Sequence, residues 1–436
     1  MFCAHDGHSR HDLGPIRGRS SLLKPMNPDD QAAPRDTILI RVTGPDGPGI
    51  TTNLLSLLSG AGAEVQDMEQ VVVRQQLTLG LAITVPAGRD LVKEVLLFGY
   101  ERGLEMNFEV VDATPTRHAE RLVVTALAPE LSPADLSVVT GAIATSGGNI
   151  DRIHRLSRFP VWSYEFLVEG ARSDNLRTDL IQVAADRRID IAVQPHGLSR
   201  RSTRMIVMDV DSTLIRNEVI DLLAAEAGHE ARSAELTAAA MAGEIDFETA
   251  LRKRVRLLAG QPTEIIDSAI VHMNLTRGAR TFARTLKRLG YKVAIISGGF
   301  THFTDHLAKR FKFDHAYANE LEIRDGRLTG EVVGDVIDAE AKARLLRQLA
   351  YIEGVPLEQI VAVGDGANDL PMLTAAGLGI AFNAKPIVAE SADATVNVPY
   401  LDAILFMLGV TREEVEAADA STTPLSTERP LSALLP

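Results

Sequence analysis

The sequence is poor in several features that would point to particular classes of protein. Its 436 residues include a single cysteine, Cys3, which excludes an intramolecular disulfide and a cysteine-rich zinc site. No apolar run reaches the roughly 18 to 20 residues that cross a bilayer, and residues 1–36 lack the apolar core of a signal peptide. Basic residues number 45 against 58 acidic ones, so no broad positive field favours nucleic acid or an anionic membrane. We therefore expect a cytoplasmic protein with neither a nucleic-acid nor a membrane partner.

The composition is that of a folded chain with several domains. Hydrophobic residues make up 45% and charged residues 24%, as in ordinary soluble proteins. A chain of this length is expected to form two to four domains. Residues 1–36 and 417–436 are polar and lack apolar periodicity, so we predict a disordered leader and a disordered tail. Met26 is an alternative start to Met1.

Two similar segments follow the leader. In the first, Thr37–Thr43 reads as a strand, 49–61 as a helix, and 65–74 and 77–85 as two paired strands. The same order begins again at Arg121. Each copy is therefore predicted to be a βαββαβ unit of the α+β ferredoxin-like type, over residues 37–118 and 119–198.

The pattern changes after Ser199 to short apolar strands that alternate with helices. This alternation predicts an α/β domain with a mainly parallel, Rossmann-like sheet over residues 203–416. Residues 219–285 are helix-forming without a clear strand, which predicts an inserted helical cap. Asp325-Gly326, between alternating apolar residues of 321–333, predicts a tight hairpin. The expected strands are 205–210, 291–296, 359–363, 378–381 and 395–398.

Carboxylates and phosphate-binding groups follow these strands. Asp209 and Asp211 come directly after the first strand, where open α/β folds bind ligands. Two carboxylates this close repel each other, and a hard divalent cation such as Mg²⁺ would neutralise them. Asp365 and Asp369 form a second pair of carboxylates, after the predicted strand 359–363. Taken alone, either acidic pair could simply cap a turn. The hydroxyl of Ser297 and the backbone N–H groups of Gly298 and Gly299 supply hydrogen-bond donors for an anion after another strand. Lys342, at the start of a predicted helix, supplies a positive charge for the same purpose.

Together these motifs, DVDST, SGG, Lys342 and GDGAND, resemble those of the haloacid dehalogenase-like phosphohydrolases. The resemblance implies that Asp209 is a nucleophile, Asp211 a general acid and base, and Mg²⁺ the cofactor. It places the metal on Asp209, Asp211 and Asp365, with Asp369 supporting it. The phosphate would be held by Ser297, Gly298, Lys342 and Asn368.

The cap segment 241–255 resembles that of the phosphoserine phosphatases. The resemblance implies that Glu218 binds the substrate ammonium and Arg254 its carboxylate, with Met241 and Phe247 as an apolar wall. Without this resemblance, Arg254 would be interpreted as part of a run of basic residues on a helix surface, 252–254.

The two N-terminal repeats resemble ACT domains, which often bind amino acids. The turn 44–50 matches the ACT ligand loop, which implies that L-serine or another amino acid binds near Asp46 and Gly49. The equivalent loop of the second copy, 127–133, lacks the glycines. A packing or oligomerisation module is the alternative, and ACT units that pair their sheets would make the protein a homodimer.

The function implied is Mg²⁺-dependent hydrolysis of O-phospho-L-serine to L-serine and phosphate through an aspartyl-phosphate, the last step of L-serine biosynthesis. Amino-acid binding at the ACT domains would regulate it. Three alternatives stay open: a phosphatase or phosphotransferase acting on another small phosphomonoester, an amino-acid sensor with an inactive phosphatase body, and a scaffold built on the repeats.

Overall fold

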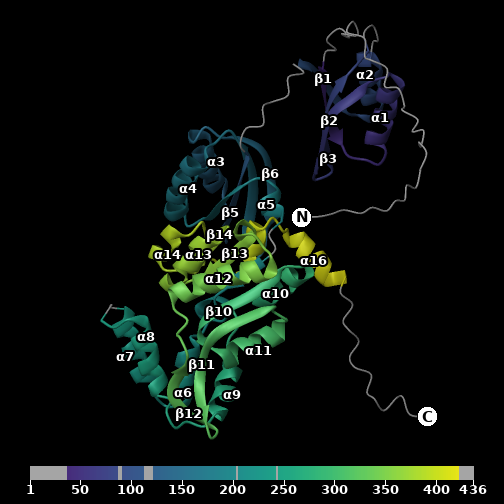
Figure 1. Ribbon diagram of the computed structural model, residues 1–436. Helices are drawn as coiled ribbons and strands as arrows, with labels where there is room; N and C mark the ends of the chain where they lie inside the picture. Colours follow the sequence, from purple (N-terminus) through teal and green to yellow (C-terminus); the bar gives the residue numbers. More distant parts are fainter. Residues whose placement is uncertain (1–36, 87–90, 112–120, 203–204, 242–243, 422–436) are drawn as a thin grey trace, which may run out of the picture. The chain divides into compact units, whose positions relative to one another are not determined.

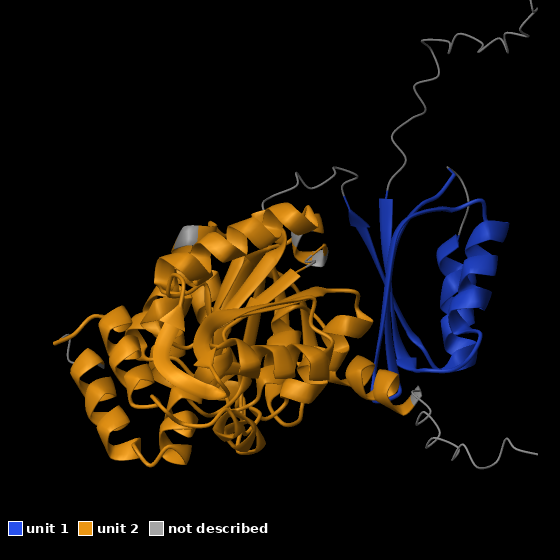
Figure 2. Cartoon of the chain, turned by 60° about the horizontal axis from the view of Figure 1, so that its bottom comes forward, with its two compact units in different colours: residues 1–117 blue, residues 118–436 orange. Residues whose placement is uncertain are grey.

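The computed structural model describes residues 37–86, 91–111, 121–202, 205–241 and 244–421. The chain forms two compact units, residues 1–117 and 118–436 (Figure 2). The predicted leader, 1–36, lies outside the described residues. Within the described part, no helix is both long and apolar enough to cross a membrane.

The first unit is a four-stranded antiparallel sheet with two helices. The strand order is β2-β3-β1-β4. Alternate residues of β3, from Leu77 to Ile83, are buried, so one face of the sheet is apolar, as the period of two in a strand requires. Both helices lie against the same side of the sheet (Figure 2). The elements are β1 (Thr37–Pro45), α1 (Ile50–Gly60), β2 (Glu64–Val73), β3 (Gln76–Thr84), α2 (Leu91–Arg102) and β4 (Glu105–Val111).

The second repeat opens the second unit and has the predicted βαββαβ order. Ser132 begins α3 because its side chain accepts a hydrogen bond from the N–H of Asp135, while the Asp135 carboxylate accepts one from the N–H of Ser132. The elements are β5 (Arg121–Ala128), α3 (Pro133–Thr145), β6 (Asn149–Ser157), β7 (Trp162–Glu169), α4 (Ser173–Arg187), β8 (Asp190–Pro195) and a short α5 (Leu198–Arg201).

The remaining strands form a mainly parallel sheet. They run in the order β12-β11-β10-β9-β13-β14-β15, and only β12 is antiparallel to its neighbour. The chain leaves β9 first to one side and later to the other, so the topological switch point lies at the carboxyl end of β9. The strands are β9 (Met205–Met208), β10 (Lys292–Phe300), β11 (His315–Arg324), β12 (Arg327–Val333), β13 (Ile360–Gly364), β14 (Leu378–Phe382) and β15 (Ala394–Val396).

The predicted hairpin turn at Asp325-Gly326 is confirmed. Both residues have positive φ, 50° and 74°, as the tight hairpin turn requires.

Helices cover the sheet and build the cap. Figure 1 shows α6 to α9 gathered with the β11–β12 hairpin at the lower end of the unit. The predicted cap range, 219–285, extends too far, because α10 packs against β10 of the sheet. The cap helices are α6 (Val219–Glu226), α7 (Glu230–Met241), α8 (Phe247–Arg256) and α9 (Glu264–Val271). The others are α10 (Ala279–Arg288), α11 (Thr301–Phe311), α12 (Ala339–Glu353), α13 (Leu370–Ala375), α14 (Pro386–Ser391), α15 (Ile404–Met407) and α16 (Arg412–Ser421).

The predicted disordered tail begins too early. Helix α16 continues to Ser421, so the prediction is wrong for residues 417–421, while 422–436 lie outside the described residues. Thr411 and Glu414 form reciprocal hydrogen bonds at the start of this helix. Near its end, Asp419 pairs with Arg284 and Arg288 of α10.

The second repeat and the α/β domain share one eleven-stranded sheet, which the sequence did not predict. A single residue pair, Ala192 with Ala394, joins β8 to β15 in antiparallel fashion. Beside it, the buried carboxylate of Asp190 accepts hydrogen bonds from the backbone N–H and side-chain amide of Asn397 at 2.8 and 2.7 Å. The joint is therefore polar at this point.

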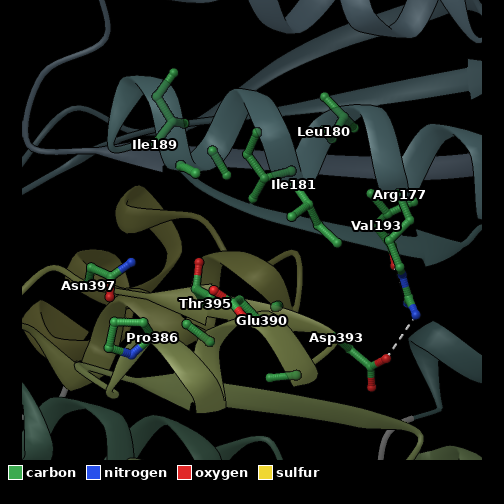
Figure 3. Close-up of a pocket in the computed structure, with 16 residues that line it drawn as sticks. Arg177, Leu180, Ile181, Ile189, Val193, Pro386, Glu390, Asp393, Thr395 and Asn397 are labelled. Atoms are coloured by element: carbon green, nitrogen blue, oxygen red, sulfur yellow. Dashed lines mark hydrogen bonds and ion pairs between the residues drawn. The ribbon is translucent and has the colours of Figure 1, made fainter.

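A cavity of about 210 Å³ lies next to this joint, between α4 and β8 on one side and α14 and β15 on the other (Figure 3). Leu180, Ile181 and Pro386 are among its mainly apolar walls. At one end, the guanidinium of Arg177 lies 3.0 Å from the carboxylate of Asp393. The second repeat is thus fixed to the α/β domain by polar pairs that flank an apolar hollow.

Changing Asp190 to asparagine is expected to flatten the pH dependence of stability. Burial, the largest cause, raises the pKa of Asp190 from 3.8 to about 6. The folded chain therefore favours the neutral carboxyl, and this stabilisation is lost as the pH rises from about 4 through about 6. Over that range, the free energy of unfolding of the wild type should fall by about 3 kcal/mol more than that of Asp190→Asn. Urea unfolding at several pH values measures the difference, and parallel curves would contradict it.

Candidate active site

Three carboxylates meet at the carboxyl ends of β9 and β13. Asp209 follows β9, and its backbone N–H donates to the carbonyl of Val363 on β13 at 2.9 Å, which keeps the two strand ends together. Asp365 and Asp369 lie on the loop after β13. One carboxylate oxygen from each of Asp209, Asp365 and Asp369 lies within 4.8 Å of the others. This grouping offers the hard oxygen ligands that a divalent cation prefers.

A buried lysine lies between two of these carboxylates. Lys342 is in the first turn of α12, which begins there because the side chain of Asp338 accepts a hydrogen bond from the N–H of Ala341. Its Nζ is 2.8 Å from Oδ1 of Asp209 and 2.7 Å from Oδ1 of Asp369. The Lys342 side chain is 1% exposed. The ammonium of Lys342 therefore forms ion pairs with two carboxylates in a site that is shielded from solvent.

Asp209 is not an ordinary aspartate. Burial first, and then the negative charge of Asp369, raises the pKa of Asp209 well above its usual range, although Lys342 opposes both effects. Its Oδ1 is buried and, although close to Lys342, accepts no well-aligned hydrogen bond. A divalent cation bound by the three carboxylates would add positive charge beside that of Lys342 and lower the pKa of Asp209, so the donor set fits a metal.

Asp211 is held in place by two hydrogen bonds. Its Oδ1 accepts from the backbone N–H of Val219 at 2.9 Å, and its Oδ2 accepts from the hydroxyl of Ser297 at 3.2 Å. Burial first, and then the charge of Glu218, raises the pKa of Asp211 to about 7. A carboxyl with this pKa can both donate and accept a proton near neutral pH.

The SGG loop lies beside this carboxylate. The Ser297 hydroxyl is buried and accepts a hydrogen bond from the N–H of Gly299 at 2.8 Å. A Cβ on Gly299 would come within 2.9 Å of Asp211, so the close approach requires glycine. The other predicted phosphate-binding residue, Asn368, lies in the turn after β13 that also carries Asp369.

Sequence reasoning missed three polar residues that position these groups. Asn319 of β11 donates to the carbonyl of Gly298 and accepts from the N–H of Ile337, both at 2.8 Å, and so fastens the SGG loop to the segment before α12. Thr213 donates to Asp365 at 3.0 Å. Ser212 donates to Glu218 at 2.8 Å. The two hydroxyls follow directly on Asp211 in the sequence, whereas Asn319 carries no local signal.

The cap brings a buried arginine toward the acidic loop. The side chain of Arg254 on α8 is buried, which excludes the interpretation that it belongs to a surface run of basic residues. Its Nη1 donates to Thr237 of α7 at 3.2 Å, while its Nε is buried without a hydrogen-bond partner. Burial lowers the pKa of Arg254, and the negative charges of Asp221 and Glu218 oppose the shift. Arg254 makes no ion pair within 4.0 Å among the described residues, so its charge is available to a ligand.

The two predicted wall residues lie on neighbouring cap helices. Phe247 begins α8, and its ring lies 3.2 Å from the position that a Cβ on Gly298 would take, so it borders the SGG loop. Met241 is the last residue of α7, and its side chain lies outside the described residues.

The predicted ACT ligand residues lie in the first unit. Gly49 immediately precedes α1 and has φ of 88°, a conformation that other residues rarely adopt. The N–H of Asp46 donates to the carbonyl of Gln75 at 2.9 Å. Both belong to the turn between β1 and α1.

Family models and known relatives match this architecture. The haloacid dehalogenase-like hydrolase family matches residues 206–374, and two ACT domain families match 36–109 and 121–194. A phosphoserine phosphatase of Streptomyces coelicolor is 50% identical over 88% of this chain and 94% of its own length. Phosphoserine phosphatase SerB2 of Mycobacterium tuberculosis is 46% identical over 88% and 96%. A structure of a probable phosphoserine phosphatase from Vibrio cholerae has a TM-score of 0.52 and 33% identity, covering 68% of this chain and 88% of that one.

The capped parallel sheet and the carboxylates at its switch point define a haloacid dehalogenase-like hydrolase that two ACT domains precede in the sequence. More narrowly, the chain belongs to the phosphoserine phosphatase family. It is therefore a phosphatase, as the sequence motifs predicted, and its fold class is confirmed.

Proposed function

We propose that the protein hydrolyses O-phospho-L-serine to L-serine and phosphate with Mg²⁺ as its cofactor, as the last step of L-serine biosynthesis. The observation that carries the proposal is Lys342, buried between Asp209 and Asp369 with Asp365 close by. The relatives named as phosphoserine phosphatases support the choice of substrate.

In the first step Asp209 attacks phosphorus, and the bond from phosphorus to the seryl oxygen breaks. Asp211 protonates the departing oxygen, for which a pKa near 7 is suited. Lys342 and the SGG loop orient the phosphoryl group and stabilise its charge. When bound by Asp209, Asp365 and the carbonyl of Asp211, Mg²⁺ would offset the negative charge of phosphate and carboxylates.

In the second step water cleaves the aspartyl-phosphate on Asp209. Asp211, now ionised, takes a proton from the attacking water, so the acid of the first step becomes the base of the second. Phosphate then leaves, and Asp209 and Asp211 return to their starting states. Phe247 and Met241 would shield the intermediate from bulk water.

Specificity is proposed to come from the cap. The ammonium of phosphoserine would bind Glu218, and its carboxylate Arg254. A site that buries charged groups rejects an analogue that leaves them unpaired. The buried Nε of Arg254 without a partner supports this role.

Replacing Arg254 with alanine is expected to raise KM for phosphoserine at least about tenfold, the scale of a lost charge-assisted hydrogen bond. The KM for 4-nitrophenyl phosphate, which has no carboxylate, should change far less. Steady-state kinetics on both substrates measures the split, with Arg252→Ala as the control on the same helix. Equal losses on both substrates would remove Arg254 from carboxylate recognition.

The proposed activity is tested by phosphate release from a panel of small phosphomonoesters with and without Mg²⁺. Phosphoserine should be the best substrate, and release should stop when EDTA removes the metal. A better substrate in the panel would favour the alternative phosphatase, and transfer to an added alcohol would favour a phosphotransferase. No release at all would favour the sensor or the scaffold.

We further propose that L-serine, the product, binds the first ACT domain at the turn of Asp46 and Gly49 and regulates the enzyme. The ACT domains would also pair two chains in a homodimer, and the exposed apolar side chains of β2, among them Val71, support this. Light scattering decides between dimer and monomer.

Changing Gly49 to valine is expected to abolish serine binding at this turn, because φ of 88° strains a β-branched residue. Asp46→Ala, which leaves the backbone free to keep its conformation, should weaken the binding as well. Isothermal calorimetry of the full chain measures both. Glu130→Ala, in the equivalent loop of the second repeat, is the control and should bind serine normally. Unchanged binding in all three variants would show that the site lies elsewhere.

A further inference from the structure

A second cavity, of about 430 Å³ and with mainly polar walls, lies beside the two segments that connect the cap to the sheet domain. Three arginines from separate segments line it: Arg216 from the connection into the cap, Arg280 from α10 and Arg310 from α11. Its other polar walls include Asn274, Thr276 and Thr281. None of its lining residues is acidic.

The charges of these arginines are not balanced within the described part of the chain. Arg216, Arg280 and Arg310 are exposed and make no ion pair within 4.0 Å with any described residue, although the guanidinium of Arg310 lies 5.7 Å from the centre of the Phe311 ring. The nearby Arg284 and Arg288, in contrast, both pair with Asp419. Like charges gathered in one hollow repel each other, and an anion bound between them would relieve that repulsion. Such a concentration stands out in a chain whose net charge is −13.

The two connecting segments pair with each other at the wall of the cavity. The N–H of Arg216 donates to the carbonyl of Asn274 at 2.8 Å, and Ile215 and Leu275 form a β-bridge. An anion held by Arg216 together with Arg280 and Arg310 would therefore tie the base of the cap to α10 and α11.

The same wall is bonded to the loop that carries the catalytic carboxylates. The hydroxyl of Thr276 donates to the carbonyl of Thr213 at 2.7 Å, and its N–H donates to the carbonyl of Leu214 at 3.0 Å. Thr213 in turn donates to Asp365. A ligand that contacts Thr276 in the cavity would thus be linked to Asp365 of the acidic cluster through a single intervening residue, Thr213.

We propose that this cavity binds a small molecule with two or more adjacent phosphate groups, at a site separate from the one that hydrolyses phosphoserine. Guanidinium groups match phosphate oxygens in geometry and can bind them through paired hydrogen bonds. Three of them from three segments suit a compact anion with several charges better than a single phosphate.

Inorganic pyrophosphate is the probe, titrated by calorimetry into the full chain with EDTA present so that no metal complex forms. The wild type should bind it saturably, and the double variant Arg280→Gln/Arg310→Gln should bind it at least about tenfold more weakly. Pyrophosphate should also raise the thermal unfolding midpoint of the wild type but not of the double variant. The kcat for phosphoserine should be the same in both proteins.

The matched control is Arg344→Gln/Arg347→Gln, which removes the same charge from the exposed face of α12 and should bind pyrophosphate like the wild type. Equal binding by all three proteins would show that pyrophosphate binds outside this cavity and would overturn the proposal. Absence of saturable binding to the wild type would overturn it too. Citrate that bound as tightly as pyrophosphate would contradict the assignment to phosphate groups.

Discussion

Replacing Asp209 with asparagine is expected to lower kcat for phosphoserine by about 10³-fold or more, the scale of losing a nucleophile. The amide is nearly the same size as the carboxylate but is a poor nucleophile, so the covalent step cannot begin. The fold should survive, because Asp209 already sits in a site where burial and Asp369 disfavour its charged form. Stopped assays of serine release measure the loss.

The control for this change is Asp325→Asn, the same chemical substitution in the exposed turn between β11 and β12. Asparagine tolerates positive φ, so this variant should match the wild type in both kcat and unfolding midpoint. If Asp209→Asn kept most of the activity while remaining folded, Asp209 would not be the nucleophile.

Replacing Lys342 with methionine is expected to damage stability and activity together. Methionine fits the buried space, but Asp209 and Asp369 lose their shared ammonium. Breaking a buried ion pair by removing one partner costs about 3 to 5 kcal/mol of unfolding free energy. Phosphoryl transfer should fall as well, because the phosphate loses a positive charge.

The stability loss in Lys342→Met should depend on pH. Without the ammonium, the pKa of Asp209 in the folded chain rises further, because Lys342 no longer opposes the effect of burial, so the folded chain binds more protons than the unfolded chain. The free energy of unfolding of the variant therefore falls as the pH rises, and the loss is smaller under acidic conditions than at neutral pH. Denaturant unfolding measures this. Lys309→Met, at the exposed end of α11, is the control, and a loss of the same size there would refute the account.

The location of the site could be predicted from the sequence because strands leave local signals. Asp209 and Asp365 each follow an apolar run, and parallel strands bring their carboxyl ends to one edge. Their convergence on Lys342 then follows from the position of that lysine at the start of α12. The helix start at Thr411, with Glu414 three residues later, is an equally local signal of α16, the helix that extends into the expected tail.

Other features depend on contacts between distant segments and leave no such signal. The pairing of β8 with β15 rests on one residue pair and on Asp190 meeting Asn397, which are far apart in sequence. Burial of Arg254 depends on how α7 and α8 pack, since a run of basic residues alone reads as surface. The pKa of Asp211 near 7 likewise comes from burial and from Glu218, which only the folded chain supplies.

The most direct test of the catalytic account is to quench the enzyme with acid during turnover of phosphoserine and to map phosphorylated peptides by mass spectrometry. The account predicts an acid-stable, alkali-labile phosphoryl group on the peptide that contains Asp209, and its disappearance in Asp209→Asn. Rapid phosphate release with no phosphorylated peptide, or with the group on a different residue, would contradict it.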